Sequence, residues 1–501
     1  MEGRFRFPNE LWLEVCPYLP LNSVRSLSST NRSLYAIARP LSFTEFKLYP
    51  YPYEYNPPQE LLADALARLS FYSSQEIAPL VRTCTARQSY HSRRWPACDS
   101  THGDDARDGG APHALMNAFF VRLPHFTGLQ RLYADRIHFT RAGLEALCAL
   151  PPLRHAEFDA CTLTTASPNA ATTTLRVANF VTRHITDAVW LALLCHDSLR
   201  SLKLSDLLLL ARPSVGPLPY VHSLTAIPYH LMIWDALTIF AKFPALRVFI
   251  TDYTGVLRNL TPAQEGAIFP LLEEYTGAAE NLHVFTQRPT LAHITIDGGI
   301  AFSRLPAEFR GVAMPLSNIT SFTAQFSTAS AGEWVFGGAE MDAIFTWFPR
   351  LKKLQLTFYP DVEDGGAFVP RPTSLVETSL AANPLLPDTL ESISLAWDFP
   401  ELYSTDADSD TDSDGRDLAP ALPTDEFPAT AVRDALISRC PALGYIYFNG
   451  YHFAYVWWKT SWVWEATAGS YAYASACIPA DAENLRGRKD ERMYGPPILL
   501  T

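Results

Sequence analysis

The chain has 501 residues, of which 48% are hydrophobic and 18% are charged, and its formal net charge is -12. This length exceeds the usual size of one compact core, so we expect several domains or an elongated repeat array. The negative charge argues against a nucleic-acid-binding protein, because neutralising phosphates requires clustered Lys and Arg.

The cysteines and the apolar segments bear on the cellular compartment. None of the eight cysteines forms a CxxC pair, which predicts reduced and mostly buried thiols. The first residues lack the apolar core of a signal peptide, and there is no run of about eighteen apolar residues that could span a membrane. We therefore expect a cytoplasmic and/or nuclear protein that does not enter membranes.

The first 45 residues predict three short helices. Pro8 suits the first turn of a helix, and Leu11, Val15 and Leu19 recur every four residues, which would place them on one helical face. Pro17 is expected to end this helix a turn early, because its ring opposes the carbonyl four residues back.

Two further helices are predicted after Pro20. Asn22 or Ser23 can cap the second helix, and the third would begin near Asn31 and end at Pro40. Helices this short cannot bury their apolar faces alone, so they need a partner surface.

This N-terminal segment, 1–45, resembles the F-box, the module that connects a substrate receptor to a cullin-type ubiquitin ligase. The family signature is Leu-Pro, a nearby Glu-Leu, then Val or Ile, Leu, and a further Val and Leu pair, and here Phe7 replaces the first Leu. The resemblance implies that the matching residues bind a Skp-type adaptor: Pro8, Glu10, Leu11, Val15, Leu19, Val24 and Leu27. The alternative is that these helices only cap the segment that follows them.

Residues 46–128 are predicted to form a connector and the first irregular repeats. Alternating apolar residues predict a strand over 43–48, and helical spacing predicts an amphipathic helix over 59–72. A second apolar, strand-like run covers 77–84. Residues 85–113 are polar and contain glycines, which predicts a mobile surface loop.

From Leu129 onward one pattern recurs. Residues 153–163 nearly match the leucine-rich repeat LxxLxLxxCxL. Weaker copies begin at Leu129, Leu175, Leu199, Leu246, Leu291, Ile319, Leu351, Leu390 and Leu443. Further repeats are expected near Leu224 and within 271–285, because the intervals there are long enough for an additional repeat.

A proline stands two residues before several of the leucines that open a repeat. In four cases the preceding segment has helical periodicity, so each repeat is expected to be a helix, a proline stop and a strand. The five prolines that stand two residues before an opening leucine are Pro151, Pro244, Pro289, Pro349 and Pro441. The pattern resembles that of the leucine-rich-repeat group of F-box proteins.

We therefore predict an α/β fold in which a three-helix F-box precedes an irregular leucine-rich-repeat solenoid over 129–465. Stacked repeats would place parallel strands on a concave face and helices on a convex face. An ordinary α/β domain with a parallel sheet is the alternative. Residues 466–501 are expected to be a C-terminal cap or tail.

Two insertions are predicted within the repeat array. Residues 359–387 are rich in proline and should form a surface excursion. Residues 404–426 contain a run of Asp among Ser and Thr, which predicts a disordered segment. Part of this run resembles a calcium loop, but Ala421 stands where the bidentate Glu would be required.

The sequence contains none of the common motifs for catalysis, phosphate binding or dinucleotide binding, and its Cys and His spacings match no compact zinc site. We expect no metal, no cofactor and no catalysis by the chain itself. The family resemblance implies a non-catalytic substrate receptor that binds a Skp-type adaptor, through it a cullin, and an unidentified protein substrate. The alternatives are a repeat scaffold without a ligase role and an enzyme with an unfamiliar site.

The predicted substrate surface is the row of strand residues that alternate with the inward leucines. This row gains aromatic residues only near its C-terminal end, and binding energy concentrates in such anchors. The predicted contacts are Lys353, Gln355, Tyr445, Tyr447 and Asn449. The aromatic stretch 445–464 predicts strands with a turn near 459–461, which form a cap, a ligand platform or both.

Overall fold

The chain is described here by a computed structural model. It describes residues 9–50, 59–88, 114–151, 153–163, 174–184, 188–226, 236–251, 257, 260–309, 314–327, 338–359, 380–381, 383–397, 429–449, 453–459 and 462–467. The chain divides into two compact parts, Met1–Leu246 (the N-terminal unit) and Arg247–Thr501 (the C-terminal unit).

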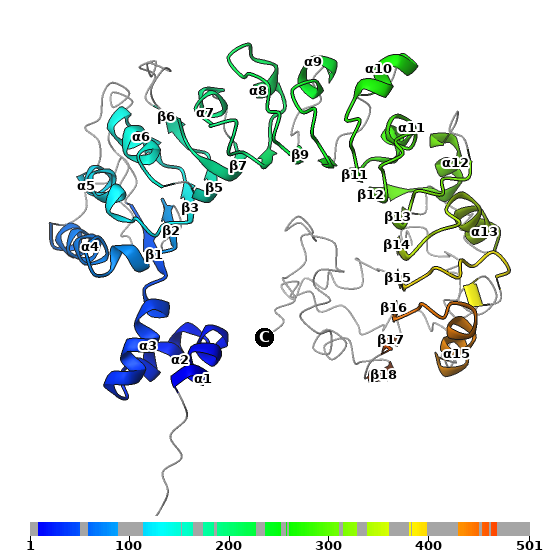
Figure 1. Ribbon diagram of the computed structural model, residues 1–501, viewed down its shortest axis with the longest axis horizontal. Coiled ribbons are helices and arrows are strands. Elements are labelled where there is room, and N and C mark those ends of the chain that lie inside the picture. Colours follow the sequence, from blue (N-terminus) through cyan, green and yellow to red (C-terminus); the bar gives the residue numbers. More distant parts are fainter. Residues whose placement is uncertain are drawn as a thin grey trace, which may run out of the picture. The chain divides into compact units, whose positions relative to one another are not determined.

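The N-terminal unit begins with three short helices, α1 (Asn9–Val15), α2 (Leu21–Ser28) and α3 (Arg32–Ser42). A single 3-10 turn, Cys16–Tyr18, follows α1. α1 ends early, as Pro17 predicts. Leu19 therefore lies outside the helix and does not share a helical face with Leu11 and Val15, although the sequence predicted that it would. α3 leads directly into the first strand (Figure 1).

The caps of these helices agree with the sequence only in part. The side chain of Asn31 accepts a hydrogen bond from the backbone N–H of Leu34 at 2.9 Å, as expected for an N-cap. The prediction that Asn22 or Ser23 caps α2 is wrong, because both lie inside this helix. α3 also continues past Pro40 to Ser42, since a proline in the last turn removes only one backbone donor from the helix.

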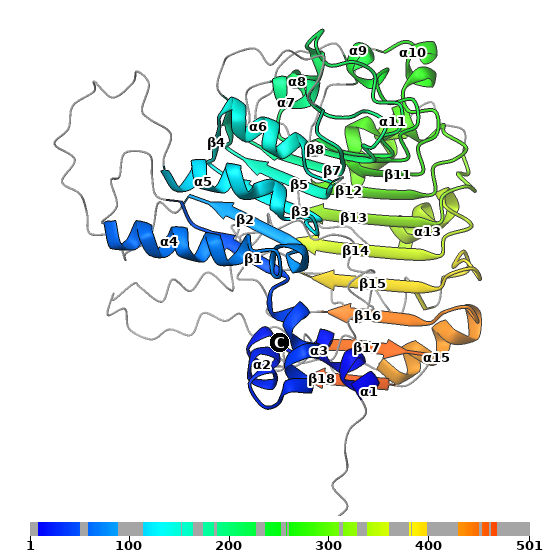
Figure 2. The same ribbon diagram turned by 60° about the vertical axis from the view of Figure 1, so that its left-hand side comes forward.

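The strands of the N-terminal unit form a ladder in which each strand is parallel to the next. They are β1 (Glu45–Leu48), β2 (Thr83–Arg87), β3 (Arg131–Asp135), β5 (Leu153–Asp159), β7 (Val177–Arg183), β8 (Ser201–Leu204) and β9 (Ser223–Ala226). A separate small pair joins β4 (His138–Phe139) to β6 (Thr162–Leu163). Figure 2 shows the strands of this ladder side by side and running in one direction.

Helices lie on one side of this ladder (Figure 1). They are α4 (Gln59–Tyr72), α5 (Ala114–Arg122), α6 (Arg141–Cys148), α7 (Val189–Ala192), α8 (Leu208–Ala211) and α9 (Ala236–Phe240), with 3-10 turns at Ala78–Leu80 and Leu123–His125. The bounds of α4 are those that the sequence predicts.

The C-terminal unit has its own ladder, parallel from β10 to β16 and antiparallel from β16 to β18. Its strands are β10 (Val248–Thr251), β11 (Glu274–Gly277), β12 (His293–Ile300), β13 (Ser321–Ser327), β14 (Lys353–Tyr359), β15 (Ser392–Trp397), β16 (Tyr445–Asn449), β17 (Phe453–Trp458) and β18 (Trp462–Thr467). Its helices are α10 (Pro262–Ala267), α11 (Leu282–Phe285), α12 (Leu305–Glu308), α13 (Gly338–Trp347) and α15 (Ala429–Arg439), with 3-10 turns at Ala279–Asn281 and Phe302–Arg304. The strands predicted within 445–464 are thus confirmed.

The recurring sequence pattern coincides with the strands. Apart from β5, which begins at Leu153 itself, each strand whose opening leucine or isoleucine was predicted begins two residues after it. All of these opening residues are at most 2% exposed. The segments before Pro151, Pro244, Pro349 and Pro441 form α6, α9, α13 and α15 as predicted. The α/β class with a large parallel sheet is therefore confirmed, and the arrangement is compatible with a solenoid.

The alternation of inward and outward residues builds the core. In β5, Leu153, Ala156 and Phe158 are at most 2% exposed, whereas His155, Glu157 and Asp159 lie on the opposite face and are half-buried. Aromatic rings fill the space between the strands and the helices, with Phe158 centred 4.8 Å from the ring of Trp190 in α7. Burial of such large apolar side chains is the main favourable contribution to folding.

Three segment predictions need correction. The strand-like run 77–84 contains the 3-10 turn Ala78–Leu80, where Pro79 lacks a ladder donor, so the strand begins only at Thr83. β2 then extends through Arg87, so the predicted loop 85–113 starts too early, and residues 89–113 lie outside the described part. The end of the predicted surface excursion 359–387 is partly buried.

That buried end packs against α13. Leu380 is 0% exposed and Asn383 is 3% exposed, and the side-chain amide of Asn383 donates to Asp342 Oδ1 at 2.7 Å. The acidic insertion 404–426 lies outside the described residues, as do 468–501. None of the described helices is both long and apolar enough to cross a membrane.

Candidate functional site

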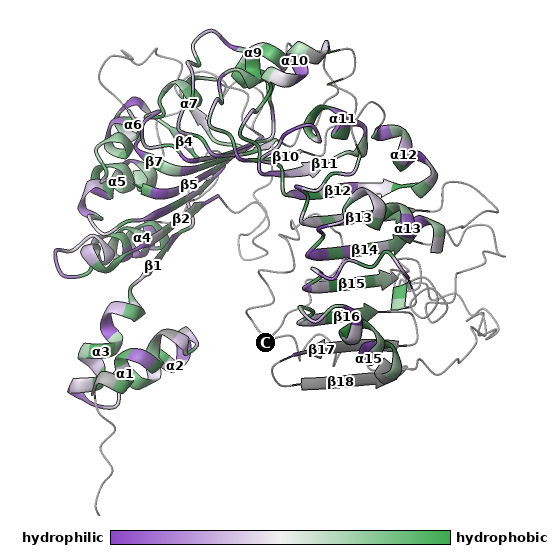
Figure 3. Cartoon of the chain, turned by 45° about the vertical axis from the view of Figure 1, so that its right-hand side comes forward, coloured by the Kyte–Doolittle hydropathy of each residue, from purple (hydrophilic) through white to green (hydrophobic). Residues whose placement is uncertain are grey.

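The first candidate surface is the outer face of α1. Leu11, Leu13 and Val15 are 41%, 59% and 39% exposed, although aliphatic side chains are usually buried. Figure 3 shows apolar and polar residues next to each other along α1 to α3. Leu11 and Val15 lie one helical turn apart and define the α1 face, whereas Leu13 is exposed on the other side of the helix. The α1 face is therefore available for a partner with an apolar surface.

The other predicted adaptor residues occupy different environments. Val24 is 2% exposed and packs in the interior of the helical module with Cys16 and Ala38, which are 1% and 0% exposed. Leu19 and Leu27 are half-buried. Glu10 lies in α1, and Pro8 lies outside the described residues. The structure thus leaves Leu11 and Val15 as exposed members of the predicted set, whereas Val24 supports the module from within.

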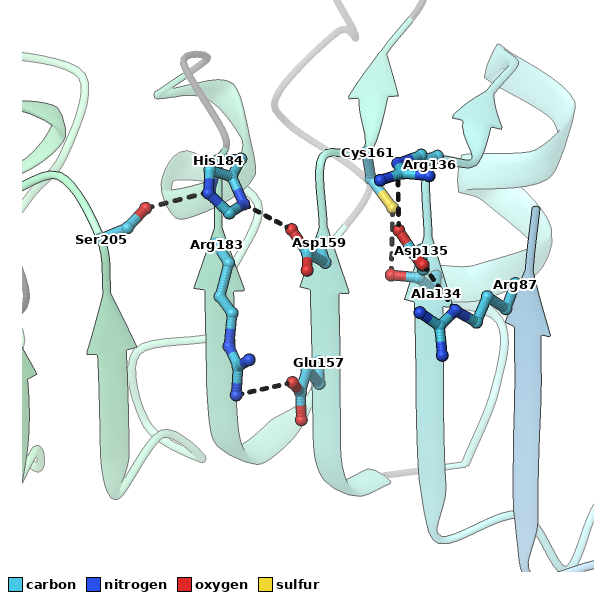
Figure 4. Close-up of polar contacts among 10 residues, drawn as sticks. All are labelled: Arg87, Ala134, Asp135, Arg136, Glu157, Asp159, Cys161, Arg183, His184 and Ser205. Atoms are coloured by element: carbon cyan, nitrogen blue, oxygen red, sulfur yellow. Dashed lines mark hydrogen bonds and ion pairs between the residues drawn. The ribbon is translucent and has the colours of Figure 1, made fainter. Parts of the chain in front are cut away.

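The second candidate surface is the charged cluster on the strands of the N-terminal unit (Figure 4). Arg87, Asp135, Asp159 and Arg183 occupy matching register positions on β2, β3, β5 and β7. They lie on the face turned away from the buried side chains, because residues alternate between the two faces of a strand. The register thereby brings together four charges from segments that are far apart in the sequence.

Ion pairs connect these strands. Arg87 Nε lies 3.0 Å from Asp135 Oδ2, and Arg183 Nη2 lies 3.4 Å from Glu157 Oε1. His184 Nδ1 lies 2.9 Å from Asp159 Oδ1. Figure 4 shows these contacts crossing from strand to strand. Each of the three carboxylates therefore has a basic side chain from a neighbouring strand beside it.

Burial and hydrogen bonding shift the pKa values of two groups in this region. The hydrogen bond from His155 holds the pKa of Glu157 below its ordinary value, with a further contribution from Arg183, while partial burial opposes this effect. Burial raises the pKa of the Cys161 thiol to about 12. This thiol lies 3.3 Å from the carbonyl oxygen of Ala134, to which it donates a hydrogen bond. Cys161 is therefore an inward structural residue, and Glu157 is an ionised surface acid.

The residues just after β3, β5 and β7 adopt left-handed backbone conformations. Arg136, Ala160 and His184 have φ values of 57°, 47° and 51°. The N–H of Arg136 donates to the Asp159 carbonyl at 2.8 Å, and that of Ala160 donates to the Arg183 carbonyl at 2.9 Å. The N–H of His184 instead donates to Ser205 Oγ at 3.1 Å. These bonds fix the end of each strand against the next and so hold the charged cluster in place.

The sequence analysis did not identify this cluster. Its only sequence signal is a charged residue at the end of four successive strands of the ladder, and the partners become apparent only from the register. Chemically, the cluster places paired hydrogen-bond donors and acceptors on one face of the ladder. Among the described residues, no group of three or more His, Cys, Asp or Glu is placed to hold a metal ion.

The third surface contains the predicted substrate residues. Lys353, Ser392 and Tyr445 occupy one register row on β14, β15 and β16, and Gln355, Ser394 and Tyr447 occupy the next. Their sequence neighbours Leu354, Leu356, Ile446 and Phe448 are at most 1% exposed. The expected outward orientation of Lys353, Gln355, Tyr445 and Tyr447 is thus present. Asn449 ends β16, next to Ala396.

No protein-family model matches this chain, and the comparison with curated proteins finds no significant match.

Proposed function

We propose that this protein is a non-catalytic substrate receptor of a cullin-type ubiquitin ligase. The observation that supports this most is the α1 face, in which Leu11 and Val15 of the F-box-like signature are exposed on a three-helix module. The module would bind a Skp-type adaptor through this face. The ladders of parallel strands, interpreted as leucine-rich repeats, would hold a protein substrate near the conjugating enzyme.

The adaptor contact is tested by a double substitution. Leu11→Asp/Val15→Asp should abolish retention of a Skp-type adaptor in a pull-down, because burying unpaired carboxylates in an apolar interface costs several kcal/mol. Thermal unfolding should be nearly unchanged, since both side chains are exposed. The matched control is Leu61→Asp/Val121→Asp, which alters side chains on α4 and α5 that are 40% and 75% exposed. Adaptor retention by the Leu11→Asp/Val15→Asp protein would rule out this assignment.

We propose that the substrate contacts two neighbouring register rows. One row contains Lys353 and Tyr445, and the other contains Gln355 and Tyr447. Tyrosine side chains supply large contact area at low entropic cost, and Lys353 is an exposed charge that can select an acidic group. Photo-crosslinkers placed at Gln355 and Tyr447 should capture a co-purified substrate, whereas the same probe at the exposed Val121 should not. Crosslinks confined to the N-terminal unit would contradict this placement.

The second candidate is a repeat scaffold that binds proteins without a ligase. It is favoured by the same outward rows, which do not require an adaptor. The pull-down separates the two functions, because a scaffold would bind its protein partner and retain no adaptor in either variant.

A further inference from the structure

A row of basic residues lies where the strands of the N-terminal unit begin. Register places Arg82, Gln130, Arg154, Ala178, Arg200 and His222 at equivalent positions beside β2, β3, β5, β7, β8 and β9. Backbone hydrogen bonds confirm the alignment: the N–H of Arg154 donates to the Gln130 carbonyl at 2.9 Å, and the N–H of His222 donates to the Arg200 carbonyl at 2.8 Å. Arg176 lies two positions before Ala178 and therefore on the same face as this row. The basic edge is defined here as Arg82, Arg154, Arg176, Arg200 and His222.

The basic edge is exposed and unneutralised. All five side chains are exposed, and none of them forms an ion pair with a carboxylate within the described part of the chain. The guanidinium groups of Arg82 and Arg200 donate to backbone carbonyls, of Gly128 and of Asp197 and Leu199 respectively, which carry no formal charge. In the segments that lead into these strands (78–82, 126–130, 149–152, 174–176, 195–200 and 212–222), Asp197 is the one acidic residue. Because no carboxylate neutralises these side chains within the described part of the chain, the edge carries a positive charge that attracts anions.

In the C-terminal unit, basic residues directly before two of the strands are neutralised by acidic residues. Arg247 pairs with Glu273 across β10 and β11, and Lys352 Nζ lies 2.8 Å from Glu391 Oε1 across β14 and β15. In both pairs the basic residue stands directly before a strand and the acid stands directly before the next strand. The fold therefore accommodates cross-strand neutralisation here, and the N-terminal unit lacks it along five successive strand-to-strand steps.

We propose that the basic edge is a docking surface for an acidic protein segment in extended conformation. Parallel strands lie about 4.8 Å apart, so five steps span roughly 24 Å, which is the length of about seven extended residues. Arginine is suited to this partner because its guanidinium group forms two parallel hydrogen bonds with a carboxylate.

Two observations favour an acidic peptide over a nucleic acid. The chain as a whole has a formal net charge of -12, which repels a long polyanion more than a short acidic segment. The exposed aromatic ring at this edge, Tyr220, is already covered by the Arg200 guanidinium at 5.3 Å, so it is not free for base stacking. This inference does not rest on the α1 face or on the ligase role.

The test uses the full chain and a fluorescein-labelled ten-residue peptide of alternating Glu and Ser, followed by fluorescence anisotropy at low salt. The peptide should bind, and its affinity should fall steeply as salt is added, because the interaction is electrostatic. Arg154→Glu/Arg176→Glu should weaken binding at least roughly tenfold, since it replaces two charge-assisted contacts with repulsion. Both side chains are exposed, so the variant should unfold at the wild-type temperature.

The matched control is Arg304→Glu/Arg350→Glu, which changes the net charge equally, lies in the C-terminal unit and alters two exposed side chains that form no ion pair within the described residues. It should change the affinity less than about twofold. Arg154→Gln/Arg176→Gln should weaken binding to an intermediate degree. Absence of peptide binding, or equal weakening by the two charge-reversal pairs, would overturn the proposal. Tighter binding of a single-stranded oligonucleotide than of the peptide, lost in Arg154→Glu/Arg176→Glu, would identify a nucleic-acid surface instead.

Discussion

Ala160 adopts a backbone conformation that is unfavourable for a residue with a Cβ atom. Its φ of 47° places it in the left-handed region, which costs a residue with a Cβ about 1–2 kcal/mol. Glycine adopts this conformation freely but loses about 0.5–1 kcal/mol of additional entropy on folding. The side chain of Ala160 is small and half-buried, so its removal sacrifices little packing.

We therefore expect Ala160→Gly to leave stability unchanged or to raise it by up to about 1 kcal/mol, measured by urea unfolding. Ala67→Gly, at an exposed position inside the long helix α4, is the matched control and should lose about 0.5–1 kcal/mol. A loss at Ala160 as large as that at Ala67 would show that the left-handed conformation there is not maintained in solution.

At the scale of elements, Arg288 lies between α11 and β12 and connects this segment to the end of α10. It is 6% exposed, and its guanidinium donates to the carbonyl of Ile268 from Nε at 3.1 Å and from Nη2 at 2.9 Å, and also to the carbonyl of Glu265. The side-chain amide of Asn318 in turn donates to the Arg288 carbonyl at 3.0 Å. A buried charge thus satisfies the carbonyls at the end of a helix.

Arg288→Ala should destabilise the protein by about 2–4 kcal/mol, because it leaves the buried Ile268 carbonyl without this donor and creates a cavity. Arg288→Lys should recover only part of the loss, since a single ammonium cannot reproduce the planar set of donors. The exposed neighbour Gln287→Ala should change stability by less than about 0.5 kcal/mol. Chemical denaturation measures all three, and an Arg288→Ala protein as stable as Gln287→Ala would refute this assignment.

At the scale of the whole molecule, the ladders predict that a core substitution destabilises the strands around it rather than the whole chain. In stacked repeats each repeat contacts mainly its neighbours, so a lost core side chain weakens nearby repeats first. Leu202 of β8 and Leu354 of β14 are 0% and 1% exposed and belong to different units. They form a matched pair for testing how far such a perturbation spreads.

Each of the substitutions Leu202→Ala and Leu354→Ala should cost about 2–5 kcal/mol locally. Hydrogen exchange should show lost amide protection around β7 to β9 for the first variant and around β13 to β15 for the second. Uniform loss across all described strands in both variants would instead indicate one cooperative folding unit.

The positions of the strands were largely predictable because their signal is local. An opening leucine, two alternating apolar residues and a preceding proline specify where a strand begins and which face is buried. The same local information located α4 and the early end of α1 at Pro17. It failed at Pro40, and at Asn22 and Ser23, because propensities for stopping or capping a helix are small compared with the packing of a whole helix.

The sequence by itself determined the α/β class, the strand positions and the outward orientation of residues such as Lys353 and Tyr445. Only the tertiary structure decided which side chains become neighbours, because strand register joins residues that are far apart along the chain. The Arg87–Asp135 and Arg183–Glu157 pairs, the exposure of Leu11 beside the burial of Val24, and the basic edge without carboxylate partners among the described residues all depend on that register and packing. Periodicity specifies which face a residue occupies, whereas charge complementarity across strands is a property of the assembled sheet.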